Sequence, residues 1–303
     1  MSANVPRCVI ERGHDRYPAS LLDMESPPEA IYVFGDPDSL CTETISIVGA
    51  RRCTPYGCAV AEIAGRVSAE SGITVVSGGA MGCDSMAARA ALDAGGRTVV
   101  VSGCGADVVY PRTSRDVFER AVESGGAVVS LERWGSPPRK YAFPKRNLVI
   151  AALSPVTLIC EAGEKSGTMS TALAASDLGR TLYAVPGSIF SAESQGTNRL
   201  IADGASPICS EHDLEACIAL DYNRLRLAEE RPCESETRIM SALVATPMRA
   251  DDLARYVAED VLTVLGTLAD YEANGFVVRL RDGRYSASKD YLAMRDSIEH
   301  EAN

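Results

Sequence analysis

A glycine-rich segment between residues 77 and 84 is the part of this chain best suited to hold an anion. Glycine lets the backbone adopt positive φ and approach a ligand closely, and the free N–H groups of a following helix attract phosphate. The apolar run Ile73–Ser77 precedes the segment, and the small residues Ser85–Ala94 predict a helix after it. The same pattern also fits a tight strand-to-helix turn without a ligand, in which an aspartate only caps the helix. The candidate residues of this loop are Ser77, Gly78, Gly79, Gly82 and Asp84.

Two other segments carry basic residues. Arg51 and Arg52 follow the apolar run Ile45–Val48, and a guanidinium group can hold a phosphate through two parallel hydrogen bonds. The segment 139–147 contains four basic residues, two aromatic rings and no acidic residue. This mixture suits single-stranded nucleic acid because cations follow the phosphates while rings stack on unpaired bases, although an isolated basic run is also typical of a solvated loop. Its candidates are Lys140, Tyr141, Phe143, Lys145, Arg146 and Asn147.

Two further loops also follow predicted strands. The sequence Lys165-Ser166-Gly167-Thr168 places a lysine and two hydroxyl groups at the start of a predicted helix, although its spacing is not that of a P-loop. Asn198 belongs to a second loop, which follows the apolar run Thr181–Val185. Several basic and glycine-rich loops at one edge of a sheet favour an anionic ligand over a set of unrelated turns.

The elements that must position these loops alternate between short apolar strands and helical segments. Continuous apolar strands joined by helical crossovers predict a parallel sheet covered on both faces, which is a Rossmann-like, doubly wound α/β fold. Ligands of such sheets bind at the carboxyl ends of the strands, where these loops begin. The predicted strands are Ile45–Val48, Ile73–Ser77, Thr98–Ser102, Ala127–Leu131, Val156–Cys160 and Thr181–Val185, and the main helices are Tyr56–Ser71, Arg115–Ser124, Arg146–Leu153 and Thr168–Leu178.

The pattern divides the chain into parts. Residues 1–40 are predicted as an extension that packs on the core, 41–220 as the mostly parallel Rossmann-like domain, and 221–234 as a charged linker. Three predicted helices and a hairpin around Asp282-Gly283 then indicate a small winged-helix domain at 235–288, followed by a tail at 289–303. The third of these helices, Glu259–Ala273, is acidic, which favours a protein contact over duplex DNA.

Composition limits the class of protein. The chain has 303 residues, of which 46% are apolar and 23% charged, as in a globular protein. It shows neither a basic-then-apolar leader nor a run near the roughly 18 apolar residues that a membrane span requires. We therefore expect a cytoplasmic protein without a membrane span.

Charge and reactive residues limit the chemistry. The formal net charge of −11 argues against a general affinity for nucleic acid, so a nucleic-acid site would have to be local. Ten cysteines without a C-x-x-C motif predict reduced thiols and no metal site. The three histidines, His14, His212 and His300, lie in no motif with a nucleophile or a carboxylate, so histidine-based catalysis is not expected.

Taken in order, these motifs resemble those of the DNA-processing protein A family, the DprA/Smf proteins of bacteria, over roughly residues 16–288. The matching motifs are Tyr17-Pro18, Gly49-x-Arg51, Thr54-Pro55-Tyr56-Gly57, Ser77-Gly78-x-x-x-Gly82-x-Asp84, Val109-Tyr110-Pro111, Phe143-Pro144-Lys145-Arg146-Asn147, Lys165-Ser166-Gly167-Thr168, Val185-Pro186-Gly187-Ser188 and Gly196-Thr197-Asn198-Arg199.

The resemblance implies a homodimeric, non-enzymatic protein that binds single-stranded DNA without sequence preference, with no cofactor and no catalytic residue. It also implies protection of incoming DNA during natural transformation and help in loading the RecA recombinase. Carried over by motif, Arg51, Lys145, Arg146 and Lys165 would contact phosphates and Phe143 would stack on a base. Gly78, Gly79, Gly82, Ser166, Gly167 and Asn198 would shape the pocket.

Two alternatives stay open at this point. Phosphoribohydrolases of the LOG family share a Ser-Gly-Gly loop and a later Gly-Thr helix start, but Thr171 stands where their catalytic glutamate is expected. A nucleotide-sensing Rossmann module would need the same loops without the basic segment 139–146.

Overall fold

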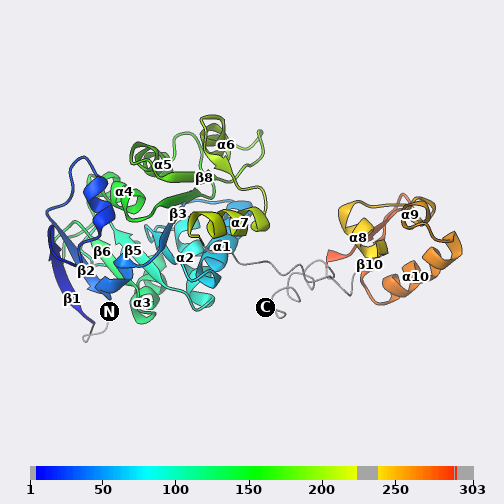
Figure 1. Cartoon of the computed structure of the whole chain (residues 1–303), viewed down its shortest axis with the longest axis horizontal. Helices are drawn as coiled ribbons and strands as arrows, with labels where there is room; N and C mark the ends of the chain where they lie inside the picture. The colour runs from blue at the N-terminus through cyan, green and yellow to red at the C-terminus, as the bar shows by residue number, and fades with distance from the viewer. Residues whose placement is uncertain (1–4, 224–237, 290, 292–303) are drawn as a thin grey trace. The chain divides into compact units, whose positions relative to one another are not determined.

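The computed structural model describes residues 5–223, 238–289 and 291, and the chain divides into two compact units, 1–226 and 227–303. Figure 1 shows the larger unit with α1 to α7 and the smaller one with α8 to α10. Residues 224–234 of the predicted linker, and all of the predicted tail except 289 and 291, lie outside the described residues.

The larger unit is built on a nine-stranded sheet in the order β1-β2-β6-β5-β4-β3-β7-β8-β9. β1 pairs with β2 and β2 with β6 in antiparallel fashion, whereas the other neighbours are parallel. The strands are β1 (Arg7–Glu11), β2 (Ala30–Gly35), β3 (Thr44–Val48), β4 (Thr74–Ser77), β5 (Thr98–Ser102), β6 (Ala127–Ser130), β7 (Val156–Ile159), β8 (Thr181–Ala184) and β9 (Ser206–Pro207).

Helices cover both faces of this sheet, which confirms the predicted doubly wound α/β fold. α1, α2, α3 and α7 pack on one face, and α4, α5 and α6 pack on the other. Neighbouring side chains of β5 show the division, because Val99 and Val101 face α4 while Val100 faces α3. The helices are α1 (Pro55–Glu70), α2 (Cys83–Asp93), α3 (Arg115–Glu123), α4 (Ala142–Leu153), α5 (Thr168–Asp177), α6 (Gln195–Ala202) and α7 (Glu211–Asp221), with short 3-10 turns at Ala19–Asp23, Pro37–Cys41 and Arg112–Ser114.

The strand order reverses at β3. From β3 the chain builds outward through β4, β5 and β6 on one side, and then returns to add β7 and β8 on the other. Loops at the carboxyl ends of β3 and β7 therefore diverge to opposite faces and leave a crevice, which is where open α/β sheets bind ligands. The arginines after β3 and the lysine after β7 border this crevice.

Two features differ from the sequence-based expectation. The first forty residues do not only pack on the core but contribute β1 and β2 to the sheet. The helix predicted to begin at Arg146 begins at Ala142, so the prediction of its start was wrong. Pro144 lies in the first turn of α4, where its missing N–H costs no helical hydrogen bond. Phe143, Lys145 and Arg146 are thus held on a helix.

The smaller unit contains α8 (Arg238–Ala245), α9 (Ala250–Val257), α10 (Val261–Ala273) and an antiparallel pair, β10 (Val277–Arg279) and β11 (Tyr285–Ala287). Its own core includes Leu243, Leu253, Val264 and Leu268. The order of three helices and a hairpin is the predicted one, and the winged-helix assignment stays a prediction. The first helix of this domain was predicted over residues 236–244, and residues 236 and 237 of it lie outside the described residues.

Three further findings concern the described residues alone. None of their helices combines the length and the apolar character needed to cross a bilayer. Their nine cysteines are free thiols. They form no cluster of three or more His, Cys, Asp or Glu side chains placed to share a metal ion.

Candidate functional site

A groove of about 1200 Å³ opens at the carboxyl ends of β3 and β7. The reversal of strand order creates this crevice, so the groove lies where the topology places ligands. Four of the predicted loops meet there. The lining comes from residues 48–52, Ala80 and Asp84, Arg146 and Asn147, residues 163–168 with Thr171, and Ala192, Glu193 and Gln195.

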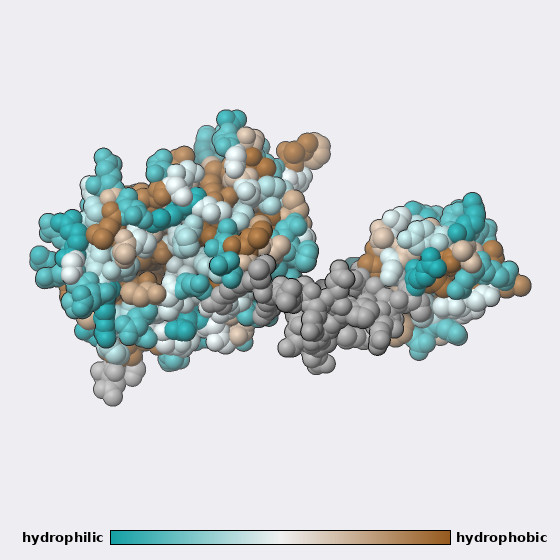
Figure 2. Space-filling model, in the orientation of Figure 1, coloured by the Kyte–Doolittle hydropathy of each residue, from teal (hydrophilic) through white to brown (hydrophobic). Residues whose placement is uncertain are grey.

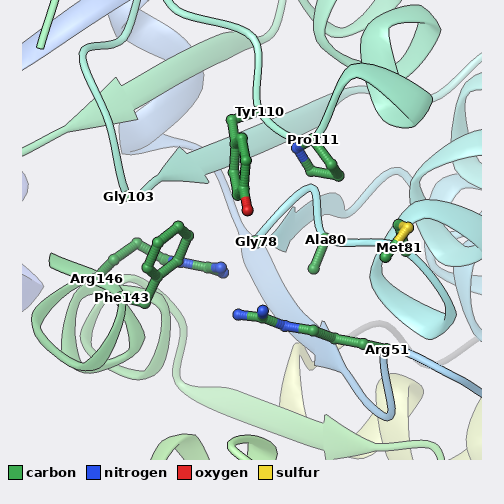
Figure 3. A pocket seen from close by; sticks show the side chains of 9 residues that line it. All are labelled: Arg51, Gly78, Ala80, Met81, Gly103, Tyr110, Pro111, Phe143 and Arg146. Atoms are coloured by element: carbon green, nitrogen blue, oxygen red, sulfur yellow. The ribbon is translucent and has the colours of Figure 1, made fainter. Parts of the chain in front are cut away.

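A smaller cavity of about 40 Å³ adjoins the groove between the glycine loop and the start of α4. Arg51, Ala80 and Arg146 line both spaces, which makes them the junction. Figure 3 shows the guanidinium groups of Arg51 and Arg146 pointing toward one another, with the rings of Tyr110 and Phe143 nearby. The remaining lining residues are Gly78, Met81, Gly103 and Pro111.

Arg146 and Asp84 form a buried ion pair at this junction. The Arg146 Nη1 lies 3.8 Å from the Asp84 Oδ2, and each side chain is only 6% exposed. The Asp84 carboxylate also accepts hydrogen bonds from the backbone N–H groups of Gly49 and Gly78, at 3.3 and 3.1 Å. The Asp84 side chain therefore joins the loop after β3, the loop after β4 and the N-terminal half of α4. Asp84 is consequently more than the helix cap that its position alone suggested.

Arg146 and Asp84 lie close enough for an ion pair but too far apart for a hydrogen bond. The 3.8 Å separation exceeds hydrogen-bond length, and the Arg146 Nε is buried without a partner among the described residues. Burial lowers the pKa of Arg146, Asp84 opposes that shift, and the neighbouring Arg51 adds to it. Burial also raises the pKa of Asp84, against the effects of Arg146 and the backbone N–H groups. An anion at the junction would relieve the repulsion between the two arginines.

Gly78 and Gly82 of the glycine-rich loop must be glycine, because other atoms occupy the space that a Cβ would take. The Arg146 guanidinium passes so close to Gly78 that a Cβ on this residue would overlap it. Gly82 has a φ of +81°, and a Cβ there would overlap the carbonyl oxygen of Ala50. These contacts explain the Gly-x-x-x-Gly spacing. Gly79 lies instead against Val100 and Phe118 of the core, and the Ser77 hydroxyl donates to the Ile47 carbonyl, so neither forms the groove surface.

The loop that carries Arg51 and Arg52 is held by a buried glutamate that the sequence analysis did not select. The Glu161 carboxylate accepts hydrogen bonds from the Thr54 N–H at 2.8 Å and from the Thr54 hydroxyl at 2.5 Å. The Glu161 carbonyl accepts one from the Ala50 N–H at 2.7 Å. Thr54 in turn caps α1. An acidic residue two positions after the apolar strand β7 was the available signal.

The loop after β7 is built by its own hydroxyl groups. The Ser166 hydroxyl accepts from the Thr168 N–H at 3.2 Å, and the Thr168 hydroxyl donates to the Gly49 carbonyl at 2.9 Å. Lys165 stays exposed at the groove wall beside Gly167. Asn147 donates to the Ser170 hydroxyl at 2.8 Å and so joins α4 to α5.

The cavity has a partly buried aromatic wall. Phe143 lies 5.8 Å from Tyr110, measured between ring centroids. The Cζ atoms of Arg51 and Arg146 lie 5.5 and 6.0 Å from the centroid of the Phe143 ring. Such distances allow cation–π attraction, which holds the ring at the junction. Tyr110 belongs to the Val109-Tyr110-Pro111 motif, but the sequence did not predict it as a site residue.

Seven predicted site residues fall outside both linings: Ser77, Gly79 and Gly82 of the glycine-rich loop, and Lys140, Tyr141, Lys145 and Asn198. Lys140, Tyr141 and Lys145 are exposed near the start of α4, where the Lys145 Nζ lies 5.7 Å from the Tyr141 ring. Asn198 uses its amide to hold a loop, since its Oδ1 accepts from the Gly187 N–H at 3.1 Å and its Nδ2 donates to the Gly187 carbonyl at 3.0 Å. Arg51, Arg52, Arg146 and Lys165 are the cations that the fold brings to the groove.

The larger unit matches the sequence profile of a known protein family. The sequence profile described as DNA recombination-mediator protein A matches residues 8–219. The chain belongs to this family. The match spans the whole parallel sheet of the larger unit, and it confirms the resemblance read from the motifs.

Individual relatives extend the comparison. Protein Smf of Escherichia coli is 36% identical over 284 residues, which cover 91% of this chain and 76% of that protein. Protein Smf of a Synechocystis strain is 36% identical over 67% of this chain, and here the chain spans about half (52%) of its relative's length. The solved structure of DNA processing protein A from Helicobacter pylori is 31% identical, has a TM-score of 0.65, and covers 73% of this chain and 99% of that chain. That work describes the single-stranded DNA binding mode of the H. pylori protein.

The buried ion pair yields a stability prediction. Replacing Asp84→Asn leaves a buried guanidinium without a counter-charge, so we expect a loss of about 3 to 5 kcal/mol in the free energy of unfolding. Arg146→Met leaves the carboxylate unpaired, and the double variant should lose less than the sum of the two single losses. Urea denaturation followed by Trp134 fluorescence reports the larger unit, because Trp134 is the chain's one tryptophan.

Asp116→Asn is the matched control. Asp116 pairs with Arg89 at 2.7 Å, but the two side chains are 45% and 30% exposed. We expect this loss to stay near or below about 1 kcal/mol. Additive losses in the Asp84 and Arg146 variants would contradict the coupling.

Proposed function

We propose that the groove binds single-stranded DNA and that the chain acts in DNA recombination. The observation that carries this proposal is the convergence of Arg51 and Arg146 at the junction, where Asp84 is the one buried carboxylate among the described residues that line the groove. The local positive charge persists in a chain whose formal net charge is −11. Positive charge focused in a cleft attracts a polyanion even when the whole protein is acidic.

The position of the aromatic ring beside the groove favours single-stranded DNA over duplex DNA. Phe143 lies within a cavity that adjoins the cations, so a base must leave its stack to reach the ring. Unpaired bases stack readily on aromatic side chains, whereas bases inside a duplex do not. The H. pylori relative, for which a single-stranded DNA binding mode is described, supports the same ligand.

The chemistry of the lining supports binding without sequence preference. The exposed cations Arg51, Arg52 and Lys165 suit phosphate oxygens, and a ring accepts any base. Glu164 and Glu193 also line the groove, and their charges oppose a polyanion there. Binding should consequently be moderate and strongly dependent on salt.

The family resemblance extends the proposal beyond the groove. It favours a homodimer in the cytoplasm that protects incoming DNA and helps load the RecA recombinase, with no catalytic step.

A LOG-type hydrolase is not favoured. Thr171 lines the groove where that family requires a glutamate, and the nearby Glu161 carboxylate is only 2% exposed and is used by Thr54. The other groove carboxylates are Asp84, which is paired with Arg146, and the rim residues Glu164 and Glu193. A nucleotide-sensing module is less favoured because the site holds more cations than one phosphate group needs.

Lys165 and Glu164 are neighbours of opposite charge in the groove, and variants of these two residues test whether the groove binds single-stranded DNA. With about three free cations in contact with phosphates, the slope of log K against log salt for oligo-dT should be about −2. Lys165→Ala should weaken binding and reduce that slope by about 0.7, because one phosphate contact is lost. Fluorescence anisotropy across a salt series measures both quantities.

Glu164→Gln is the matched control, since it changes the adjacent side chain of the same loop, which is exposed as well and also lines the groove. Removing its charge should tighten binding by about two- to fivefold at low salt. Equal affinities for the two variants and the unaltered protein would overturn the proposed groove.

The aromatic wall gives a second prediction. Phe143→Ala should weaken binding of oligo-dT by about 1 kcal/mol or more without changing the salt slope, because stacking releases no counterions. Phe143→Tyr keeps the ring and should retain affinity. A changed slope for Phe143→Ala would mean that the substitution disturbs the arginines rather than a stacking site.

A further inference from the structure

Phe190 is the most exposed large hydrophobic side chain among the described residues. It is 92% exposed, and its neighbour Ile189 is 77% exposed. Both lie in the loop between β8 and α6, and in Figure 2 brown, hydrophobic atoms project from the larger unit beside α6. Apolar rings in water are unfavourable, so an almost fully exposed phenylalanine suggests a ligand or a partner.

The loop holds this ring on a defined turn. The Ser188 hydroxyl accepts from the Phe190 N–H at 3.2 Å, and the Ser188 carbonyl accepts from the Ser191 N–H at 3.0 Å. The base of the loop is held by the two hydrogen bonds between Asn198 and Gly187. The Tyr56 hydroxyl adds a hydrogen bond to the Pro186 carbonyl at 2.7 Å. The backbone thus presents Phe190 outward from an anchored loop.

The same loop borders the groove. Ala192, two residues after Phe190, lines it, and their α-carbons lie within about 7.6 Å of one another because of chain geometry. Ala192, Glu193 and Gln195 line the groove but not the cavity that holds Phe143. The Phe190 loop follows β8, whereas Phe143 lies against Gly103, which follows β5, and β4, β3 and β7 stand between these two strands in the sheet. Arg51 follows β3 and Lys165 follows β7, so the groove cations lie between the two rings in the order of the sheet.

We propose that Phe190 is a second base-stacking site, at the end of the groove away from Phe143. This inference rests on the proposed function of the groove. Proteins that hold single strands combine cationic grooves with aromatic side chains on which successive bases stack. A ring at each end of a cationic groove fits one continuous strand. The occupant is a base of the bound strand, and a protein partner or a second copy of this chain is the competing outcome.

Phe190→Ala should weaken binding of a long oligo-dT by about fivefold or more, with an unchanged salt slope. A short oligo-dT that reaches only from Phe143 to Arg51 should bind this variant and the unaltered protein equally. Leu173→Ala is the matched control, because Leu173 is 61% exposed on α5 and lines neither space. It should bind both oligonucleotides as the unaltered protein does.

Phe190→Trp supplies a direct readout of stacking. Its indole fluorescence should be quenched by long oligo-dT beyond any quenching of Trp134 in the unaltered protein, and its affinity should be retained. Unchanged affinity of Phe190→Ala for long oligo-dT, or no added quenching, would overturn the second stacking site. A loss of oligomeric mass in sedimentation with unchanged DNA affinity would likewise overturn it, in favour of a contact between copies.

The results for the Phe190 variants can be distinguished from the results that test the groove as a DNA-binding site. If the unaltered protein binds no oligo-dT at low salt, the proposed function fails and this inference fails with it. If the unaltered protein binds and Lys165→Ala weakens binding while Phe190→Ala does not, only this inference fails.

Discussion

The buried interaction between Asp84 and Arg146 is the constraint on which the candidate site depends. The carboxylate holds the loops after β3 and β4 through the N–H groups of Gly49 and Gly78, and it lies 3.8 Å from the guanidinium at the start of α4. Burying two charges is costly, and the cost is recovered only when their partners are fixed. The pair thus fixes three segments from both faces of the sheet at one point. Gly78 is required there because the arginine passes across it.

This constraint also explains how an acidic chain can present a site for a polyanion. One arginine is used to build the junction, and Arg51 faces it at close range. Arg52 and Lys165 continue the positive charge along the groove, while Glu164 and Glu193 limit it. Most of the negative charge of the chain lies elsewhere, so the attraction is local and salt will screen it. The chain belongs to the DNA recombination-mediator protein A family, and nucleic acid is the ligand proposed for this groove.

Much of this arrangement could be predicted from the sequence. Apolar runs such as Thr98–Ser102 are buried on both faces, so their continuous pattern identified parallel strands and placed the glycine and basic loops at one edge. Contacts between distant residues could not be predicted in this way. Nothing local in Asp84 points to Arg146, and a basic residue in a basic segment gave no sign that it would be buried. Glu161 and Phe190 were missed for the same reason, because burial of the first and exposure of the second are set by packing.

The central claim is that a local basic groove binds single-stranded DNA in spite of the acidic surface of the chain. Fluorescence anisotropy of the purified protein with labelled oligo-dT and with a duplex of equal length, across a salt series, tests it most directly. The account predicts saturable binding that prefers the single strand and weakens with salt at a slope of about −2. Equal affinity for both forms, or no binding at low salt, would contradict it and would direct attention to a small nucleotide at the junction of Arg51 and Arg146.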